Sequence, residues 1–234
     1  MDFDNFKELI HESWWAKLKP WIESEECDKI YKFLKYSSGR GKVICPSSQN
    51  VWRAFLLTPY EDVKVILCGM SPYHSLYKGS PIADGLLMSC SVTGKLQPSL
   101  EKFYNGMFTE LGLDEKTHKS SDLSYLASQG VLMLNTSLTC EAMKPGNHIE
   151  LWTSFMKYLF EEVIITTGMP IVFLGKESTK IERYIAPFTW VFKLSHPAAA
   201  SYSNTDWDSG GMFLAVNNIL KGNNNTEIQW YKIE

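Results

Sequence analysis

The sequence lacks the features by which membrane, zinc-binding and disulfide-rich proteins are usually recognised. No apolar run reaches the ~18 residues that a membrane-spanning helix needs. The five cysteines are odd in number, widely spaced and never arranged as CxxC. They argue against a structural zinc site and a disulfide framework, and they are typical of a reducing compartment. The N-terminal segment MDFDNFKELIHESWW is acidic and amphipathic, so we expect no secretory signal.

The chain also lacks internal repeats, low-complexity linkers and an excess of positive charge. Lys and Arg number 23 against 26 Asp and Glu, which gives a net charge of −3. The net charge therefore does not indicate a nucleic-acid partner, although a local basic surface is compatible with it. Among the 234 residues, 44% are hydrophobic and 21% charged, which excludes wholesale disorder, collagen-like and coiled-coil proteins. We expect one domain, residues 1–234, and a monomer.

Four short apolar runs rich in β-branched residues predict buried strands. They are Val63–Cys68, Val131–Leu134, Ile171–Leu174 and Trp190–Leu194. Helical patterns lie between and after them: Leu151–Val163, Lys176–Ile185, Phe213–Leu220 and two helices that open near Pro98 and Ser121. The alternation predicts a three-layer α/β/α sandwich around a central four-stranded, mostly parallel sheet. In such folds the functional residues gather at the carboxyl ends of the strands.

The predicted strand ends carry an amide, two imidazoles, a phenol and a lysine. The first strand is followed by Gly69–His74 (GMSPYH), the second ends at Asn135, the third is followed by Lys176 and the fourth by His196. A pair of carboxylates, a glycine-rich phosphate loop and metal-ligand spacing are all missing there. Each residue alone has an ordinary structural explanation, such as a turn for Asn135. Their combination favours an active site.

These segments resemble motifs of the uracil-DNA glycosylase family. The family's GQDPYH stands as GMSPYH, its AHGLCFS-like segment as ADGLLMS at Ala83–Ser89, and its PPSL loop as QPSL at Gln97–Leu100. Its LSxWAxQGVLLLN segment stands as LSYLASQGVLMLN at Leu123–Asn135, and HPSPLS stands as HPAAAS at His196–Ser201. The order and spacing match over roughly residues 13–231. Several motifs in order are a far more specific signal than any one of them.

The resemblance implies a monofunctional DNA glycosylase that flips a deoxyuridine out of the helix and hydrolyses its N-glycosidic bond, without metal or cofactor. Asn135 would read the edge of uracil, His196 would stabilise the departing base anion, and Tyr73 would exclude the methyl group of thymine. Met70 belongs to the same substrate-binding loop. The positions that match DNA-contacting or wedge residues of the family are His74, Ser99, Ala200 and Ser201, and Lys176 would add positive charge for DNA binding.

One departure from the family pattern concerns the attacking water. Ser71 stands where the family has an aspartate that places the water and offsets the positive charge of the sugar. A serine hydroxyl can hold a water but cannot supply charge or act as a base near pH 7. The loop from His74 to Gly85 is four residues longer than is usual in the family and carries Asp84, the nearest carboxylate that could replace the aspartate. The alternative for Asp84 is an ordinary solvated or turn-forming aspartate.

Two further departures concern the flipped base. Met88 stands where a phenylalanine stacks on uracil, and it loosens the selection for shape. Ala200 aligns with the leucine that wedges into the base stack and is too short to do so, which leaves Tyr202 and Trp207 as candidates. The neighbouring Asp206 and Asp208 would repel a phosphate backbone unless they point away.

Three functions stay open on these grounds. The first is a uracil-DNA glycosylase with altered water activation at Ser71. The second is a glycosylase for a modified pyrimidine in viral DNA, favoured by the longer loop, Met88 and Ala200, although Tyr73 argues against a large substituent at C5. The third, favoured by Ser71, is a non-catalytic DNA-binding or replication-accessory protein on the same scaffold.

The expected partners are single- or double-stranded DNA containing uracil or a modified pyrimidine, together with a glycosylase-inhibitor protein or a replication partner. We expect no membrane association. The expected location is the cytoplasm, or the nucleus or a viral replication site in a eukaryotic system.

Overall fold

A computed structural model describes residues 6–165, 168–187 and 189–233 of the chain. Its centre is a four-stranded sheet in the order β5 (Val131–Asn135), β2 (Val65–Gly69), β7 (Ile171–Leu174) and β8 (Val191–Leu194). All neighbouring strands of this sheet pair in parallel. Every residue of β2, β5 and β7 is buried, which explains their unbroken apolar runs. The predicted α/β fold with a four-stranded parallel sheet is confirmed.

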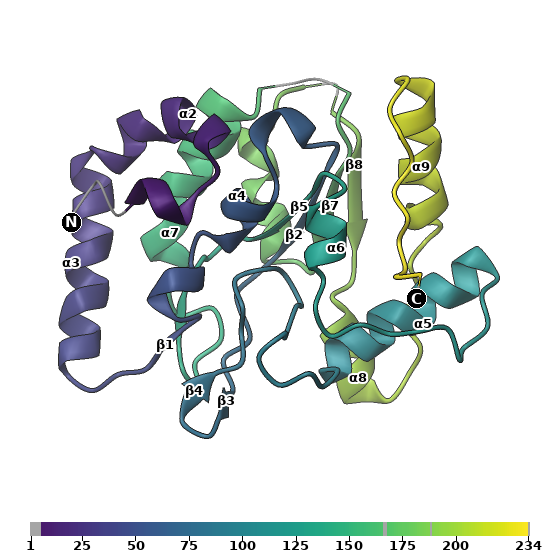
Figure 1. Cartoon of the computed structure of the whole chain (residues 1–234), viewed down its shortest axis with the longest axis horizontal. Coiled ribbons are helices and arrows are strands. Elements are labelled where there is room, and N and C mark those ends of the chain that lie inside the picture. The colour runs from purple at the N-terminus through teal and green to yellow at the C-terminus, as the bar shows by residue number, and fades with distance from the viewer. Residues whose placement is uncertain (1–5, 166–167, 188, 234) are drawn as a thin grey trace.

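The long helices flank this sheet (Figure 1). On one side of the view lie α2 (Glu12–Ile22), α3 (Glu25–Gly39) and α7 (Ile149–Tyr158), and on the other lie α5 (Pro98–Leu111) and α9 (Met212–Gly222). Three short helices complete the layers: α4 (Arg53–Leu57), α6 (Ser124–Ala127) and α8 (Pro197–Ser203). No helix in the described ranges has the length and apolar composition to cross a bilayer.

The boundaries of three predicted helices shift for local reasons. The helix expected to open near Ser121 begins at Ser124, because the Asp122 carboxylate accepts the Ser124 N–H at 2.9 Å and forms a turn first. The segment expected over Lys176–Ile185 is a 3₁₀ helix over Ser178–Tyr184, a distinction that periodicity cannot make in so short a segment. The helix expected over Leu151–Val163 begins at Ile149, is an α-helix up to Tyr158, and continues as a π turn over Leu159–Val163.

Two small pairs of strands escaped prediction. β1 (Ile44–Cys45) pairs with β6 (Cys140–Glu141), and β3 (Leu76–Tyr77) pairs with β4 (Ser80–Pro81). The second pair is a hairpin that occupies the segment found to be longer than in the family. Both pairs are too short to produce a periodic pattern in the sequence.

The high aromatic content serves the core. Trp14, Trp52, Trp152 and Trp230 are fully buried, and Trp52 and Phe155 lie with their ring centroids 5.1 Å apart in an edge-to-face contact. Burial of a large apolar side chain contributes about 1.5–3 kcal/mol. Trp52, Trp152 and Phe155 thus form an aromatic cluster between the N-terminal helices and α7, whereas Trp230 packs against Phe213 of α9.

Candidate active site

The carboxyl ends of the central strands bring the predicted residues to one edge of the sheet. Gly69 at the end of β2 is the Cα partner of Asn135 at the end of β5. β7 and β8 pair up to Leu174 and Leu194, which brings Gly175, directly after β7, close to His196, two residues after β8. A Cβ atom at Gly175 would lie 3.2 Å from the His196 Cβ, and one at Gly69 would lie 3.2 Å from the Asn135 Oδ1. Glycine at both positions therefore makes room for the two polar side chains.

Asn135 keeps a polar atom without a partner. The residue is only 4% exposed, and its Oδ1 is buried without a hydrogen-bond donor among the described residues. A buried acceptor left unsatisfied costs about 1–3 kcal/mol, so nearly all such atoms in folded proteins are paired. A ligand with an N–H group would recover this cost. The predicted binding role of Asn135 thus has a physical basis in the structure.

His196 is held as a neutral imidazole with one defined tautomer. It is the N-cap of α8, and its Nδ1 accepts the Ala198 N–H at 3.1 Å. Burial lowers the pKa of His196 from 6.5 to about 4, so the ring is uncharged at neutral pH. Because Nδ1 is an acceptor, the single ring proton lies on Nε2. The result is a neutral donor of the kind that can stabilise an oxygen on which negative charge develops.

Tyr73 is held in place by Ser99, a residue that the sequence analysis expected to contact DNA. Its hydroxyl lies 2.8 Å from the Ser99 Oγ, and burial raises the pKa of the phenol, which stays neutral. Ser99 is 5% exposed, so its hydroxyl is occupied inside the protein and does not present itself to a phosphate. We therefore assign Ser99 to the positioning of Tyr73. Ser201 donates to the Pro98 carbonyl at 2.9 Å and ties α8 to the start of α5.

Ser71 is anchored by the segment after β6. Its Oγ accepts the Gly146 N–H at 3.1 Å, which leaves the hydroxyl proton free to be donated. The Met70 carbonyl accepts the Ser137 N–H at 3.0 Å, so β5 and its following residues hold this loop. The carbonyl of His74 accepts the Met143 N–H at 2.9 Å, while the His74 Nδ1 is buried and has no partner within the described part of the chain.

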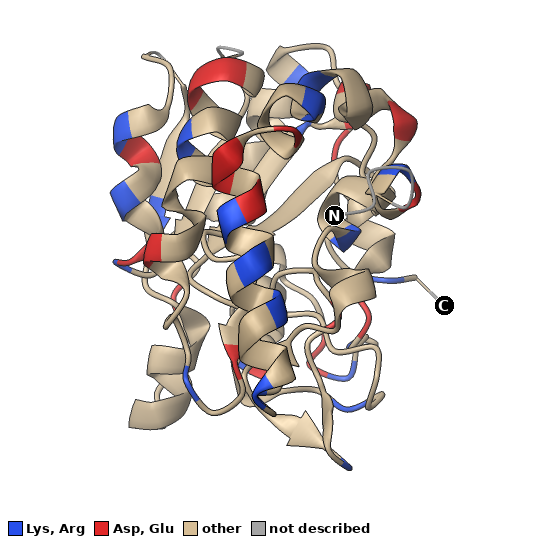
Figure 2. Cartoon of the chain, turned by 90° about the vertical axis from the view of Figure 1, so that its left-hand side faces the viewer, with Lys and Arg blue, Asp and Glu red and all other residues tan. Residues whose placement is uncertain are grey.

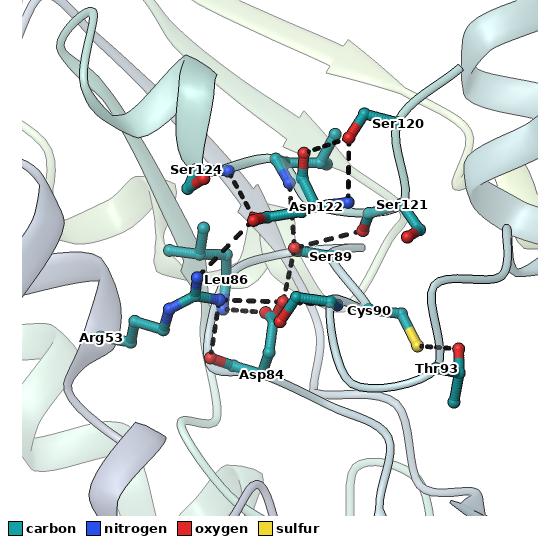
Figure 3. Close-up of polar contacts among 12 residues, drawn as sticks. Arg53, Asp84, Leu86, Ser89, Cys90, Thr93, Ser120, Ser121, Asp122 and Ser124 are labelled. Atoms are coloured by element: carbon teal, nitrogen blue, oxygen red, sulfur yellow. Dashed lines mark hydrogen bonds and ion pairs between the residues drawn. The ribbon is translucent and has the colours of Figure 1, made fainter. Parts of the chain in front are cut away.

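Asp84 does not behave as a replacement for the missing aspartate (Figure 3). It is 1% exposed, and its Oδ2 lies 2.8 Å from the Arg53 guanidinium. The same oxygen accepts the Ser89 hydroxyl at 2.7 Å and the Ser91 N–H at 2.9 Å, and Oδ1 accepts the Leu86 N–H at 3.2 Å. A carboxylate with this many donors is structural, so the geometry does not support Asp84 as the group that activates water.

The Arg53–Asp84 pair holds the segment that carries Met88. Met88 is 5% exposed and has φ of +58°, a left-handed conformation that costs a side-chain-bearing residue free energy. The preceding Leu87 packs directly against Gly69 at the end of β2. The buried ion pair thus fixes a strained segment against the strand end. Arg53 was missed, although a single charge inside VWRAFLL signals a buried partner.

Burial distinguishes the two wedge candidates, Tyr202 and Trp207, from each other, and Ala200 is buried as well. Ala200 is only 7% exposed, and Trp207 is 3% exposed with its indole N–H donated to the Ser195 carbonyl at 2.8 Å. Trp207 therefore belongs to the core, as does the short side chain of Ala200. Tyr202, on the same helix α8, is 88% exposed and projects from the molecule. Lys176, two residues after the end of β7, is also exposed.

We predict that Arg53→Met destabilises the fold strongly, because it leaves the Asp84 carboxylate buried without its cation. Removal of one partner of a buried ion pair typically costs about 3–5 kcal/mol of unfolding free energy. Urea denaturation measures the loss. Lys32→Met is the matched control, since its ion pair with Asp28 is solvent-exposed. Equal losses of unfolding free energy in the two variants would show that the buried Arg53–Asp84 pair does not stabilise the fold.

Curated bacterial uracil-DNA glycosylases are similar to this chain over most of their length. The uracil-DNA glycosylase of Acinetobacter baylyi is 31% identical over 228 residues, which cover 96% of this chain and 93% of that protein. Uracil-DNA glycosylase 1 of Listeria innocua is 34% identical over 206 residues, covering 86% and 89%. A profile of the Uracil DNA glycosylase superfamily matches residues 56–221.

Solved structures agree on the fold. The crystal structure of mimivirus uracil-DNA glycosylase superposes with a TM-score of 0.84 at 23% identity, covering 97% of this chain and 89% of that one. A variant of the mimivirus protein in complex with UGI gives a TM-score of 0.86 at 22% identity, covering 97% and 90%. Together with the profile and the bacterial relatives, these similarities show that the chain belongs to the uracil-DNA glycosylase superfamily.

Proposed function

We propose that this protein is a monofunctional DNA glycosylase that releases uracil from DNA, using a water held by Ser71 without a general-base carboxylate. The observation that carries the proposal is the buried Oδ1 of Asn135, which has no partner among the described residues and lies at the same sheet edge as a neutral His196. Membership of the superfamily supports the reaction class, and the named activity of the bacterial relatives supports the substrate.

Asn135 fits the reading of uracil by complementarity. Its amide offers an acceptor and a donor side by side, which match the N3–H and O4 of uracil, whereas cytosine presents the reverse pattern. The Oδ1 is buried without a hydrogen-bond donor among the described residues. A base that brings no N–H to this oxygen therefore does not recover the free energy of leaving it unpaired, and it binds more weakly. Tyr73, held by Ser99, closes the space next to C5 in this proposal.

His196 supports departure of the base. When the C1′–N1 bond breaks, its electron pair leaves with uracil, and the charge is shared with O2 and O4. A donated Nε2–H from a neutral imidazole stabilises that charge without first having to be protonated. Removal of one such donor typically costs ~10²–10³-fold in rate. Tyr202, the exposed aromatic of α8, is the residue we propose as the wedge that supports the flipped state.

Ser71 completes the site in a weakened form. Its hydroxyl can orient the water whose oxygen bonds to C1′, but it supplies no negative charge to the cation-like sugar. General-base help is typically worth ~10²–10⁴-fold, so we expect a slow enzyme. Glu141 is no substitute, since hydrogen bonds from Lys144 and Lys42 lower its pKa and engage both its oxygens.

The direct test is release of free uracil from single- and double-stranded oligonucleotides that contain one deoxyuridine. The proposal expects free uracil and an alkali-labile abasic site in stoichiometric amounts, without added metal. Parallel substrates with modified pyrimidines test the alternative that Met88 widens the pocket. Binding of DNA without release of any base would contradict the catalytic proposal and favour the accessory protein.

We predict that Asn135→Asp weakens uracil excision and shifts the preference towards cytosine. A protonated carboxyl group can donate to the cytosine N3 and accept from its amino group, which the amide cannot do in its present orientation. Single-turnover rates on matched uracil and cytosine oligonucleotides measure the ratio. An unchanged rate on uracil would mean that Asn135 does not read the base.

We predict that Ser71→Asp raises the rate of uracil excision, by up to ~10²–10⁴-fold if the carboxylate reaches the water. The Gly146 N–H that now bonds Ser71 can hold the new carboxylate in the same place. Ser71→Ala is the control for loss of the hydroxyl alone and should be slower than the wild type. A decrease with Ser71→Asp comparable to that with Ser71→Ala would show that position 71 does not face the water.

We predict that the rate ratio between wild type and His196→Ala stays constant between pH 5.5 and 8. With a pKa of about 4, His196 remains neutral over this range and donates throughout. Single-turnover excision by both proteins measures the ratio, and other titrating groups cancel in it. If His196 had to be protonated, the ratio would instead rise as the pH falls towards 5.5.

A further inference from the structure

The segment that is longer than in the family forms an ordered hairpin. β3 and β4 pair in antiparallel register, with Leu76 opposite Pro81 and Tyr77 opposite Ser80. The turn residues Lys78 and Gly79 have φ of +50° and +82°, values that suit the tight two-residue turns of hairpins. The Ile82 N–H donates to the Ser75 carbonyl at 3.2 Å and closes the base. The extra residues therefore build a defined projection.

The hairpin exposes the aromatic ring of Tyr77 to solvent, next to the ammonium group of Lys78. Tyr77 is 46% exposed and Leu76 37% exposed, and the Lys78 ammonium lies 5.4 Å from the centroid of the Tyr77 ring. No other described side chain is recorded as a hydrogen-bond or ring partner of Tyr77. An exposed ring on a rigid support, next to a positive charge, is how proteins build stacking platforms for unpaired bases.

The hairpin adjoins the active-site loop. It starts two residues after His74 and projects from the same end of the molecule as α8 (Figure 1). A second segment lies beside that loop: the Met143 N–H donates to the His74 carbonyl and the Gly146 N–H to Ser71. Between them Lys144 is exposed and pairs with Glu141, whose other oxygen pairs with Lys42, so two ammonium groups face one carboxylate here. With Lys78 on the hairpin, this border of the site carries a net positive charge.

The charge distribution favours this side of the site for a phosphate backbone. Beyond α8 the exposed Asp206 and Asp208 outnumber Lys102, whose ammonium lies 3.8 Å from the Asp206 carboxylate. On the side of the hairpin, the lysines of α3 follow its acidic first turn, and Lys29 and Lys32 pair with carboxylates of that turn, so this helix adds no net charge (Figure 2). An acidic strand would therefore be repelled near Asp206 and attracted towards Lys78 and Lys144.

We propose that the β3–β4 hairpin is a second DNA-contacting element that binds a single-stranded segment flanking the target nucleotide. Tyr77 stacks on an unpaired base, and Lys78 and Lys144 lie against the phosphates. The inference deepens the proposed function, since it names the strand state that this site accommodates next to the flipped base. It concerns binding, so it can be tested apart from excision.

The test is equilibrium binding of fluorescent single-stranded oligonucleotides without uracil, followed by anisotropy at several salt concentrations. Tyr77→Ala should weaken binding by about 5- to 150-fold, the loss expected for one stacked base. Lys78→Ala should reduce the steepness of the salt dependence by about 0.7, the slope for one phosphate contact on a single strand. The matched control is Lys221→Ala, which removes the same charge at the end of α9.

Two results decide the proposal. If Tyr77→Ala and Lys78→Ala bind single-stranded DNA as tightly and with the same salt dependence as Lys221→Ala, the hairpin is not a DNA-contacting element. If both variants lose affinity as stated, the hairpin contact holds even when no uracil is released. Failure of the excision assay and failure of this proposal are thus separate outcomes.

Discussion

The parallel register of the four central strands positions every part of the site. β2 and β5 pair residue by residue from Val65 opposite Val131 to Gly69 opposite Asn135, and β7 and β8 do the same up to Leu174 and Leu194. In a strand, a shift by one residue moves each side chain to the other face. A slip of β5 would therefore turn Asn135 away from the edge, and a slip of β8 would separate His196 from Gly175. The buried apolar runs that fix the register are thus also what aligns the polar groups.

The same edge stores free energy that the rest of the fold must offset. Asn135 Oδ1 and His74 Nδ1 are buried without partners within the described residues, and Met88 has a left-handed backbone. Unsatisfied groups of this kind cost about 1–3 kcal/mol each. The buried Arg53–Asp84 pair and the tryptophan-rich core hold these features in place. The site is therefore ready for a ligand before the ligand arrives, which lowers the cost of ordering it on binding.

The sequence predicted the sheet well because three of its four strands, β2, β5 and β7, are buried on both faces. Continuous apolar runs locate such strands without help from distant residues, and the polar residues that follow them mark the functional edge. Other features depended on contacts that no local pattern contains. Asp84 and Arg53 are 31 positions apart, so nothing near Asp84 showed that its carboxylate would be engaged. Likewise Tyr202 and Trp207 look equivalent in the sequence, and contacts with distant residues such as Phe103 distinguish the buried ring from the exposed one.

The central claim is that one base is held jointly by the amide of Asn135 and the neutral imidazole of His196. A crystal structure of the protein with free uracil tests it most directly. The account predicts a ring N–H donated to the Asn135 Oδ1 and a uracil carbonyl accepting the His196 Nε2–H, both at about 2.7–3.2 Å. It also predicts that the Ala198 N–H still bonds the His196 Nδ1. Uracil bound away from the ends of β5 and β8, with the Asn135 Oδ1 still unpaired, would contradict the account.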